Sequence, residues 1–142
     1  MTPEQTINAY LSELLKWETE HYSKIRTTEY RNNLENEQLL EDGRARGVLE
    51  GIINCFLTKK AILALGQSAL ITMRVGHPPV YDQSIIDTKE EGRKSYVICK
   101  SNNGALLGSV IRYTLLQEGS SWKIDQIHAS RDQITWRKNN SI

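Results

Sequence analysis

The feature that most constrains this chain is a run of three predicted strands within residues 93–128. The strands are rich in branched and aromatic residues, and they span residues 95–100, 106–117 and 122–128. Turn-forming sequences separate them, Ser-Asn-Asn-Gly at 101–104 and Glu-Gly-Ser-Ser at 118–121. Because short loops join strands that run antiparallel, the pattern predicts an antiparallel meander.

Apolar and polar residues alternate along these strands, which indicates a sheet with one buried face and one solvated face. In the middle strand, one predicted face carries Leu107, Ser109, Ile111, Tyr113 and Leu115, and the other carries Arg112 and Thr114. In the last strand, Trp122 and Ile124 share the buried face. A sheet with one apolar face needs a cover, and the N-terminal half of the chain must supply it.

The N-terminal half is predicted to begin with a long amphipathic helix. Thr2 and Gln5 have the spacing of a capping box, and Pro3 suits the first helical position. Apolar residues then recur at helical spacing from Ile7 to Ile25. The polar segment 27–42 contains neither proline nor glycine, so it is expected to be a solvated helical segment.

A second amphipathic helix is expected after Gly43, which we interpret as a boundary or a bend. Its apolar residues begin at Ala45, and the helix is expected to end near Leu57. Further along, strands are predicted at residues 69–75 and 84–88, with an interruption by Gly-His-Pro-Pro at 76–79. Helices that precede an antiparallel sheet predict an α+β fold.

The last twelve residues form a polar tail that is expected to fray. Within it, Ile134 and Trp136 are the side chains that can dock on the sheet.

Composition and charge exclude several classes of protein. The 142 residues suit one domain, spanning 1–142. A net charge of +1 gives no electrostatic case for a nucleic-acid or membrane partner. The apolar runs are far shorter than the ~20 residues that span a bilayer, and no secretory signal is evident at the N-terminus. Cys55 and Cys99 are expected to be reduced, buried thiols, so a cytoplasmic protein is predicted.

Several segments, taken in order, carry a family resemblance. They are Trp17 in the first helix, Phe-Leu-Thr-Lys-Lys at 56–60, Pro-Pro-Val-Tyr-Asp at 78–82, Glu-Glu-Gly at 90–92, Arg-Tyr-Thr-Leu at 112–115 and Trp-Lys-Ile-Asp at 122–125. Over residues 5–128 the chain resembles the bacterial immunity proteins with a nuclear-transport-factor-2-like fold. The resemblance implies a cone in which N-terminal helices pack on a curved antiparallel sheet.

The resemblance also implies a role. Such proteins are cytoplasmic antidotes that bind a toxin domain delivered by neighbouring bacteria, often the end of a large secreted polymorphic toxin. They are not enzymes and use no cofactor. The family has no shared catalytic residues, and its toxin-contacting residues vary between members. The implied partner is therefore the cognate toxin domain, but the resemblance does not say which residues bind it.

Two other hypotheses remain open. Cone-shaped relatives of this fold include isomerases and dehydratases, so a small enzyme acting on an apolar metabolite is the alternative. Its general base would be one of Asp82, Asp125, His77 and His128. Asp125 is predicted to lie opposite Ile124, where it faces solvent or caps a turn more often than it faces a cavity. The third hypothesis is a homodimer formed through the open sheet face, without a ligand.

Two regions are candidates for binding a toxin. The acid-rich segment carries Glu29, Glu35, Glu37, Glu41 and Asp42 against Arg31 alone. A charge run is usually only a solvated helix face, but an acidic surface would also be attracted to a basic toxin cleft. In the second region, two prolines fix Tyr81 and Asp82 at a surface or cavity rim, although an Asp at such a place more often forms an Asx turn into the next strand. The candidate toxin-binding residues are therefore Glu35, Glu37, Glu41, Asp42, Tyr81 and Asp82.

No metal site is predicted. The three histidines show no ligand spacing, and the two cysteines form no Cys-x-x-Cys motif.

Overall fold

The computed structural model describes residues 1–33, 35–104 and 109–142. Helices occupy the first half: α1 (Pro3–Ile25), α2 (Thr28–Asn32), α3 (Glu37–Phe56), α4 (Lys59–Ala61), the π-helical segment η1 (Ile62–Gly66) and α5 (Gln67–Thr72). The strands follow: β1 (Gln83–Glu91), β2 (Lys94–Ser101), β3 (Val110–Glu118), β4 (Ser121–Ser130) and β5 (Arg137–Lys138). This order confirms the predicted α+β class. None of the helices formed by these residues is long and apolar enough to cross a membrane.

The strands form an antiparallel sheet in the order β1-β2-β3-β4-β5, so the predicted meander is confirmed. At its centre, Tyr113 pairs with Val97 of β2 and Ile127 of β4, and all three are buried. Gly92, between β1 and β2, has a φ of 63°, a region that glycine adopts without a steric penalty. Leu107, predicted on the buried face, lies outside the described residues.

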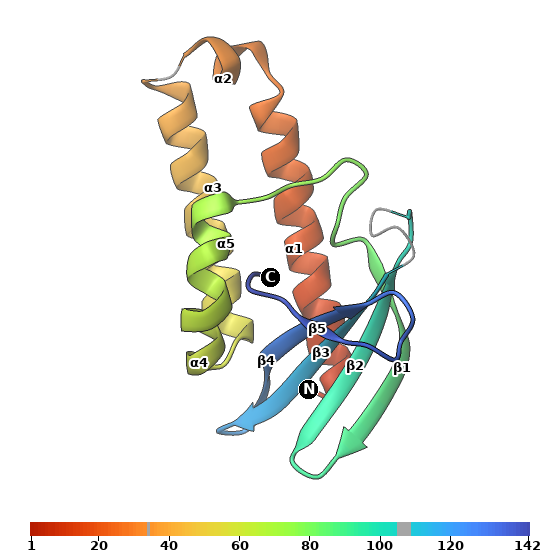
Figure 1. The fold of residues 1–142 in the computed structure, drawn as a ribbon. Coiled ribbons are helices and arrows are strands. Elements are labelled where there is room, and N and C mark those ends of the chain that lie inside the picture. The colour runs from red at the N-terminus through yellow and green to blue at the C-terminus, as the bar shows by residue number, and fades with distance from the viewer. Residues whose placement is uncertain (34, 105–108) are drawn as a thin grey trace.

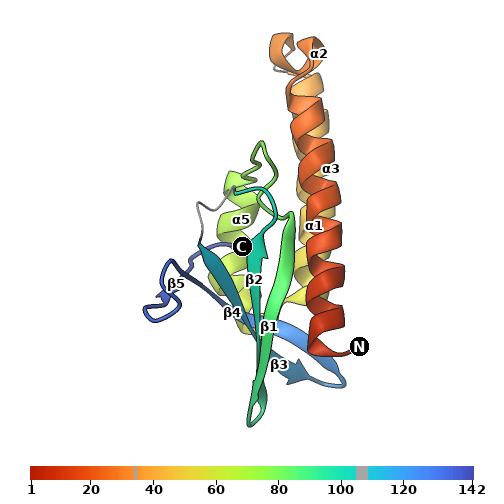
Figure 2. The same ribbon diagram turned by 90° about the vertical axis from the view of Figure 1, so that its right-hand side faces the viewer.

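The helices α1 and α3 cover one face of the curved, unclosed sheet. They lie side by side as an antiparallel hairpin whose far end, with α2, projects beyond the sheet (Figures 1 and 2). The predicted capping box at Thr2 and Gln5 is present at the start of α1. Trp17 of α1 is buried, and its indole N–H donates to the Ala45 carbonyl of α3 over 2.8 Å. This bond ties the two helices together inside the core.

Two predictions about the helices are wrong. Gly43 is not a boundary, because α3 begins at Glu37 and continues through it. Residues 69–75 contain no strand, since α5 runs to Thr72. The β-branched residues Ile71 and Thr72 favour a strand locally. However, the buried residues of this region recur at the four-residue spacing of a helix: Ala61, Leu65 and Ala69.

The polar segment 27–42 is helical in two pieces rather than one. They are α2 and the first turns of α3, and Asn33 ends the first piece in a non-helical conformation.

A β-bulge in β4 changes the surroundings of Asp125. Ile124 and Gln126 pair with consecutive residues of β3, so Asp125 between them is the extra residue. Its carboxylate accepts a 2.9 Å hydrogen bond from the hydroxyl of Thr58, which also caps the start of α4. Asp125 therefore connects the sheet to a helix, whereas the expectation was that it faces solvent or caps a turn.

The C-terminal tail pairs with the sheet instead of fraying along its length. β5 is hydrogen-bonded to β4. The Arg112 guanidinium lies 4.5 Å from the centre of the Trp136 ring, so Trp136 docks on the sheet as predicted. Ile134 does not dock, because it is 83% exposed.

Two further side chains, those of Cys55 and Trp122, are less buried than predicted. Cys99 is buried as expected, and burial raises the pKa of its thiol to about 12. Cys55 is exposed, so its predicted burial is wrong. Trp122 is only partly buried at the edge of the core, whereas Trp17 is fully enclosed.

Candidate functional site

The hairpin end comprises α2 and the described residues around it, 26–33 and 35–40. It has little core of its own, since α2 buries none of its residues. Glu35 and Glu37, two of the predicted toxin-binding residues, are exposed here and form no ion pair within the described part of the chain. Leu39 and Leu40 are each 69% exposed. The hairpin end therefore presents carboxylates beside exposed apolar side chains.

Glu41 does not belong to that exposed surface, although it was predicted to. It is 8% exposed and lies between the two long helices. One of its oxygens lies 3.1 Å from Nδ1 of His21 on α1. The Arg44 guanidinium donates to both carboxylate oxygens, over 2.6 and 2.9 Å. Glu41 therefore stabilises the hairpin and is not available to a partner.

The pKa of the Glu41 carboxyl reflects two opposing effects. Burial raises it, but hydrogen bonds from Arg44 and His21 outweigh burial and lower the pKa below its ordinary value. Glu41 is therefore charged wherever the protein is folded near neutral pH. Its negative charge is neutralised by Arg44 inside the hairpin and is not exposed on the surface.

Asp42, also predicted to bind a toxin, has an internal partner too. Its carboxylate accepts a 2.9 Å hydrogen bond from the hydroxyl of Tyr30, which links α3 to α2. The Gln38 side-chain amide donates to the Tyr30 carbonyl over 2.9 Å. These bonds hold α2 against the start of α3, so Asp42 positions the hairpin end.

The second predicted region, around Tyr81 and Asp82, is organised by Glu18. This carboxylate is fully buried and accepts hydrogen bonds from the backbone N–H groups of Gly76, Val80 and Tyr81, over 2.8, 3.0 and 3.0 Å. Tyr81 is buried below this loop, with its hydroxyl donating to the Ile142 carbonyl. Asp82 accepts from the side-chain amide of Asn102 over 2.9 Å. Asp82 therefore remains near the surface, and Tyr81 is a core residue.

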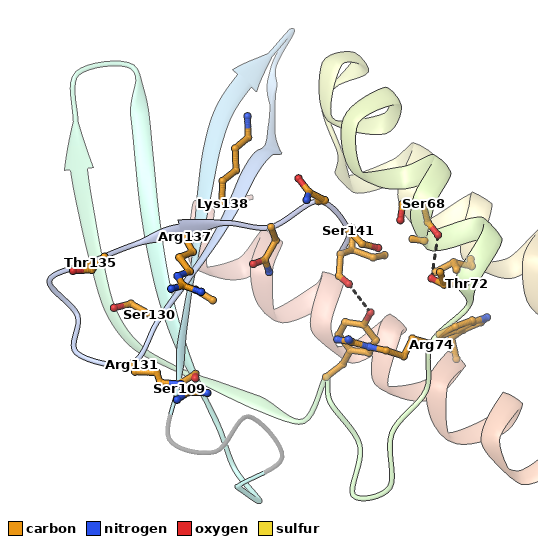
Figure 3. Close-up of a pocket in the computed structure, with 18 of the residues that line it drawn as sticks. Ser68, Thr72, Arg74, Ser109, Ser130, Arg131, Thr135, Arg137, Lys138 and Ser141 are labelled. Atoms are coloured by element: carbon orange, nitrogen blue, oxygen red, sulfur yellow. Dashed lines mark hydrogen bonds between the residues drawn. The ribbon is translucent and has the colours of Figure 1, made fainter.

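A cavity of about 850 Å³ opens between α5, the end of β4 and the C-terminal tail (Figure 3). Its floor consists of residues from the core, among them Trp17, Leu49 and Ala69. Its described lining includes four cationic side chains: Arg74, Arg131, Arg137 and Lys138. The cavity is therefore polar and basic at its rim, unlike the apolar pocket that the enzyme hypothesis requires.

The acid–base candidates of the enzyme hypothesis lie elsewhere. Asp82, Asp125, His77 and His128 are all absent from the described lining of the cavity. The His77 ring stacks on Tyr22, with ring centres 4.9 Å apart. Burial, with the nearby charges of Arg112 and Lys138, lowers the pKa of His128. No group of three or more His, Cys, Asp and Glu side chains among the described residues is arranged to hold a metal.

Sequence reasoning missed Glu18 and the cations of the cavity. A signal for Glu18 did exist, because it continues the apolar stripe of α1 through Leu14 and Trp17. A carboxylate on such a stripe is buried and needs hydrogen-bond donors. No comparable signal existed for Arg74 and Arg137, because the pairing of β5 with β4 is what places Arg137 on the cavity that Arg74 also lines.

Comparison with protein families agrees with this architecture. A model of the NTF2 fold immunity proteins matches residues 2–140. Neither the curated proteins nor the solved structures give a significant match. The predicted cone fold, with helices packed on a curved antiparallel sheet, is the fold of that family. Because the match covers nearly the whole sequence, the chain belongs to the family of NTF2 fold immunity proteins.

Proposed function

We propose that this immunity protein binds a cognate toxin domain in the cytoplasm and neutralises it, with the hairpin end as the binding surface. The observation that carries the proposal is the projection of the hairpin end beyond the sheet (Figure 2). A projecting element can enter the concave active cleft of another protein. Carboxylates and exposed leucines gathered on it supply both charge and apolar contact area.

The charge of the hairpin end suits a basic toxin cleft. Glu29, Glu35 and Glu37 are all exposed, against two exposed arginines, Arg26 and Arg31, so the hairpin end is acidic by one charge. Toxin domains that act on nucleic acids or nucleotides need basic clefts to hold phosphates. Opposite charges accelerate association, and the acceleration weakens as salt screens it. An acidic hairpin end would therefore be steered to such a cleft and would occupy it.

Two leucines supply the apolar part of the surface. Leu39 and Leu40 stand in the first turns of α3, where no described part of the chain buries them. Large exposed apolar side chains rimmed by polar residues are typical of protein interaction sites. Burying one leucine side chain contributes about 1.5–3 kcal/mol, so this pair can anchor a complex.

The proposal includes no catalysis by this chain. The acid–base candidates have structural partners or lie away from the cavity, as described above. Neutralisation then depends on occupancy of the toxin, so it requires one immunity protein for each toxin molecule.

Charge reversal at the hairpin end tests the proposal. The variant Glu35→Lys/Glu37→Lys changes exposed residues and leaves the buried Glu41 intact. We expect slower association with the cognate toxin domain at low salt, and a smaller difference at high salt. Stopped-flow mixing measures the rate. Thermal unfolding checks the fold, because Glu37 lies in the first turn of α3, where a cation costs up to about 1 kcal/mol.

The matched control is Glu90→Lys/Glu91→Lys, which makes the same change in net charge at exposed positions at the end of β1. Its association rate should stay close to that of the wild type. Equal slowing of the two variants would show that only the overall charge matters. An unchanged rate in Glu35→Lys/Glu37→Lys at low salt would refute the hairpin end as the binding surface.

A further inference from the structure

The cavity beside α5 has a strong imbalance of charge. Four cationic side chains line it, against one acidic side chain among the described lining residues, that of Asp132. None of the four cations forms an ion pair within the described ranges of the chain. All four are exposed around one hollow, so they give it a positive potential that attracts an anion.

Asp132 does not compensate these cations, because its carboxylate serves the turn in which it lies. It accepts hydrogen bonds from the backbone N–H groups of Ile134 and Thr135, both over 2.8 Å, and from the Ser130 hydroxyl over 2.9 Å. These bonds hold the pKa of Asp132 below its usual range. The carboxylate thus shapes the tail, and the guanidinium groups remain available to a ligand.

The cations stand at separate places around the cavity. Figure 3 shows Arg131 and Arg137 at one end and Arg74 at the other, beside Ser141. Arg137 and Lys138 point to opposite sides of the tail. Guanidinium groups bind phosphates and carboxylates through paired hydrogen bonds, so the two ends can each hold a negatively charged group.

The size and the floor of the cavity suit a small molecule. Its volume of about 850 Å³ lies within the range of ligand pockets, roughly 300–1,000 Å³. The floor of Trp17, Leu49 and Ala69 can contact an apolar body. The lining hydroxyl of Ser109, at the end occupied by Arg131, adds a hydrogen-bond donor.

We propose that this cavity binds a small molecule that carries at least two negatively charged groups, held by Arg74 at one end and by Arg131 and Arg137 at the other. The site is separate from the proposed toxin surface, because no described residue of the hairpin end lines it. A ligand bound here joins α5 to the tail and the sheet, so it also stabilises the folded chain.

Calorimetric titration with pyrophosphate and with ATP tests the site. Wild-type protein should bind at least one of these probes saturably at low salt. Arg74→Gln and Arg137→Gln should each weaken that binding about tenfold or more, since each removes charge-assisted hydrogen bonds. The control is Arg93→Gln, which removes an exposed cation in the β1–β2 turn and should bind like the wild type.

Either of two results would contradict the proposal that this cavity binds an anionic small molecule. One is the absence of saturable binding of both probes at millimolar concentration and low salt. The other is an equal loss of affinity in all three variants, which is the mark of non-specific attraction by net charge. Circular dichroism checks each fold, and Arg131→Gln replaces either cavity variant that fails to fold. Toxin binding is measured separately, so failure of this site leaves the hairpin-end proposal to its own test.

Discussion

Three glycines on α3 are the residues whose presence the fold explains least. Gly43, Gly47 and Gly51 are exposed at four-residue spacing, and a Cβ atom added at any of them would meet no atom within 4 Å. Glycine inside a helix is less stable than alanine by about 0.5–1 kcal/mol, because it loses more backbone entropy on folding. Among the described residues, no atom packs closely against these glycines, so no contact offsets that loss of stability.

Gly47→Ala should therefore raise the free energy of unfolding by about 0.5–1 kcal/mol. Gly66→Ala should do the opposite, because its Cβ would lie 2.8 Å from Cγ2 of Ile53 in the core. Overpacking of this kind costs about 1–3 kcal/mol. Urea unfolding of the two variants measures both effects. Destabilisation by Gly47→Ala as large as that by Gly66→Ala would show that the outer face of α3 is packed after all.

At the residue scale, the sequence predicted exposure less well than it predicted helices. The capping box at Thr2 was predicted correctly because it depends on residues three apart. Glu41 was assigned to the surface because it belongs to a run of acidic and polar residues. Once α3 is continuous, Glu41 falls four residues before the buried Ala45 and on the same face. A charge run by itself does not show which of its members faces the core.

At the scale of elements, the contact between α1 and α3 carries a pH-dependent contribution to stability. The pKa of Glu41 is lowered in the folded protein, since the hydrogen bonds from Arg44 and His21 outweigh burial. A lowered folded-state pKa means that the unfolded chain binds the proton more readily. The stabilisation is thus fully present above the ordinary glutamate pKa of about 4.3 and is lost as the pH falls through the folded-state pKa.

The free energy of unfolding should accordingly fall as the pH drops below the ordinary glutamate pKa of about 4.3, and part of that fall should belong to Glu41. Glu41→Gln removes the titrating group, so its stability should be lower at neutral pH and should change less with acid. Chemical unfolding at a series of pH values measures how the free energy of unfolding changes with pH in the wild type and in Glu41→Gln. Parallel curves for the wild type and Glu41→Gln would contradict the assignment of this contribution to Glu41.

The elements themselves were predictable where their signals are local. The strands β2, β3 and β4 follow from alternation and from the turns between them. The bulge at Asp125 was not predictable, because it depends on how β4 pairs with β3. The helical character of α5 was obscured by Ile71 and Thr72, whose β-branched side chains favour strands when read without their buried neighbours.

At the scale of the whole molecule, the sequence indicated the family but not the arrangement of its surfaces. The order of several motifs along the chain predicted an immunity protein, and the family match over residues 2–140 confirms that prediction. The cavity could not be predicted, since Arg74 and Arg137 are far apart in sequence and line the same cavity only through tertiary structure. The projection of the hairpin end likewise depends on how far α1 and α3 extend past the sheet (Figure 1).

Titration of the toxin's activity tests the central claim most directly. The purified cognate toxin domain is mixed with increasing amounts of the wild-type chain, and its remaining activity is measured. Neutralisation by binding predicts a linear fall in activity that ends at one immunity protein per toxin domain. Activity that persists at a large excess of the chain would contradict the account. So would complete loss of activity at a small fraction of one equivalent, because only a catalyst acts in that way.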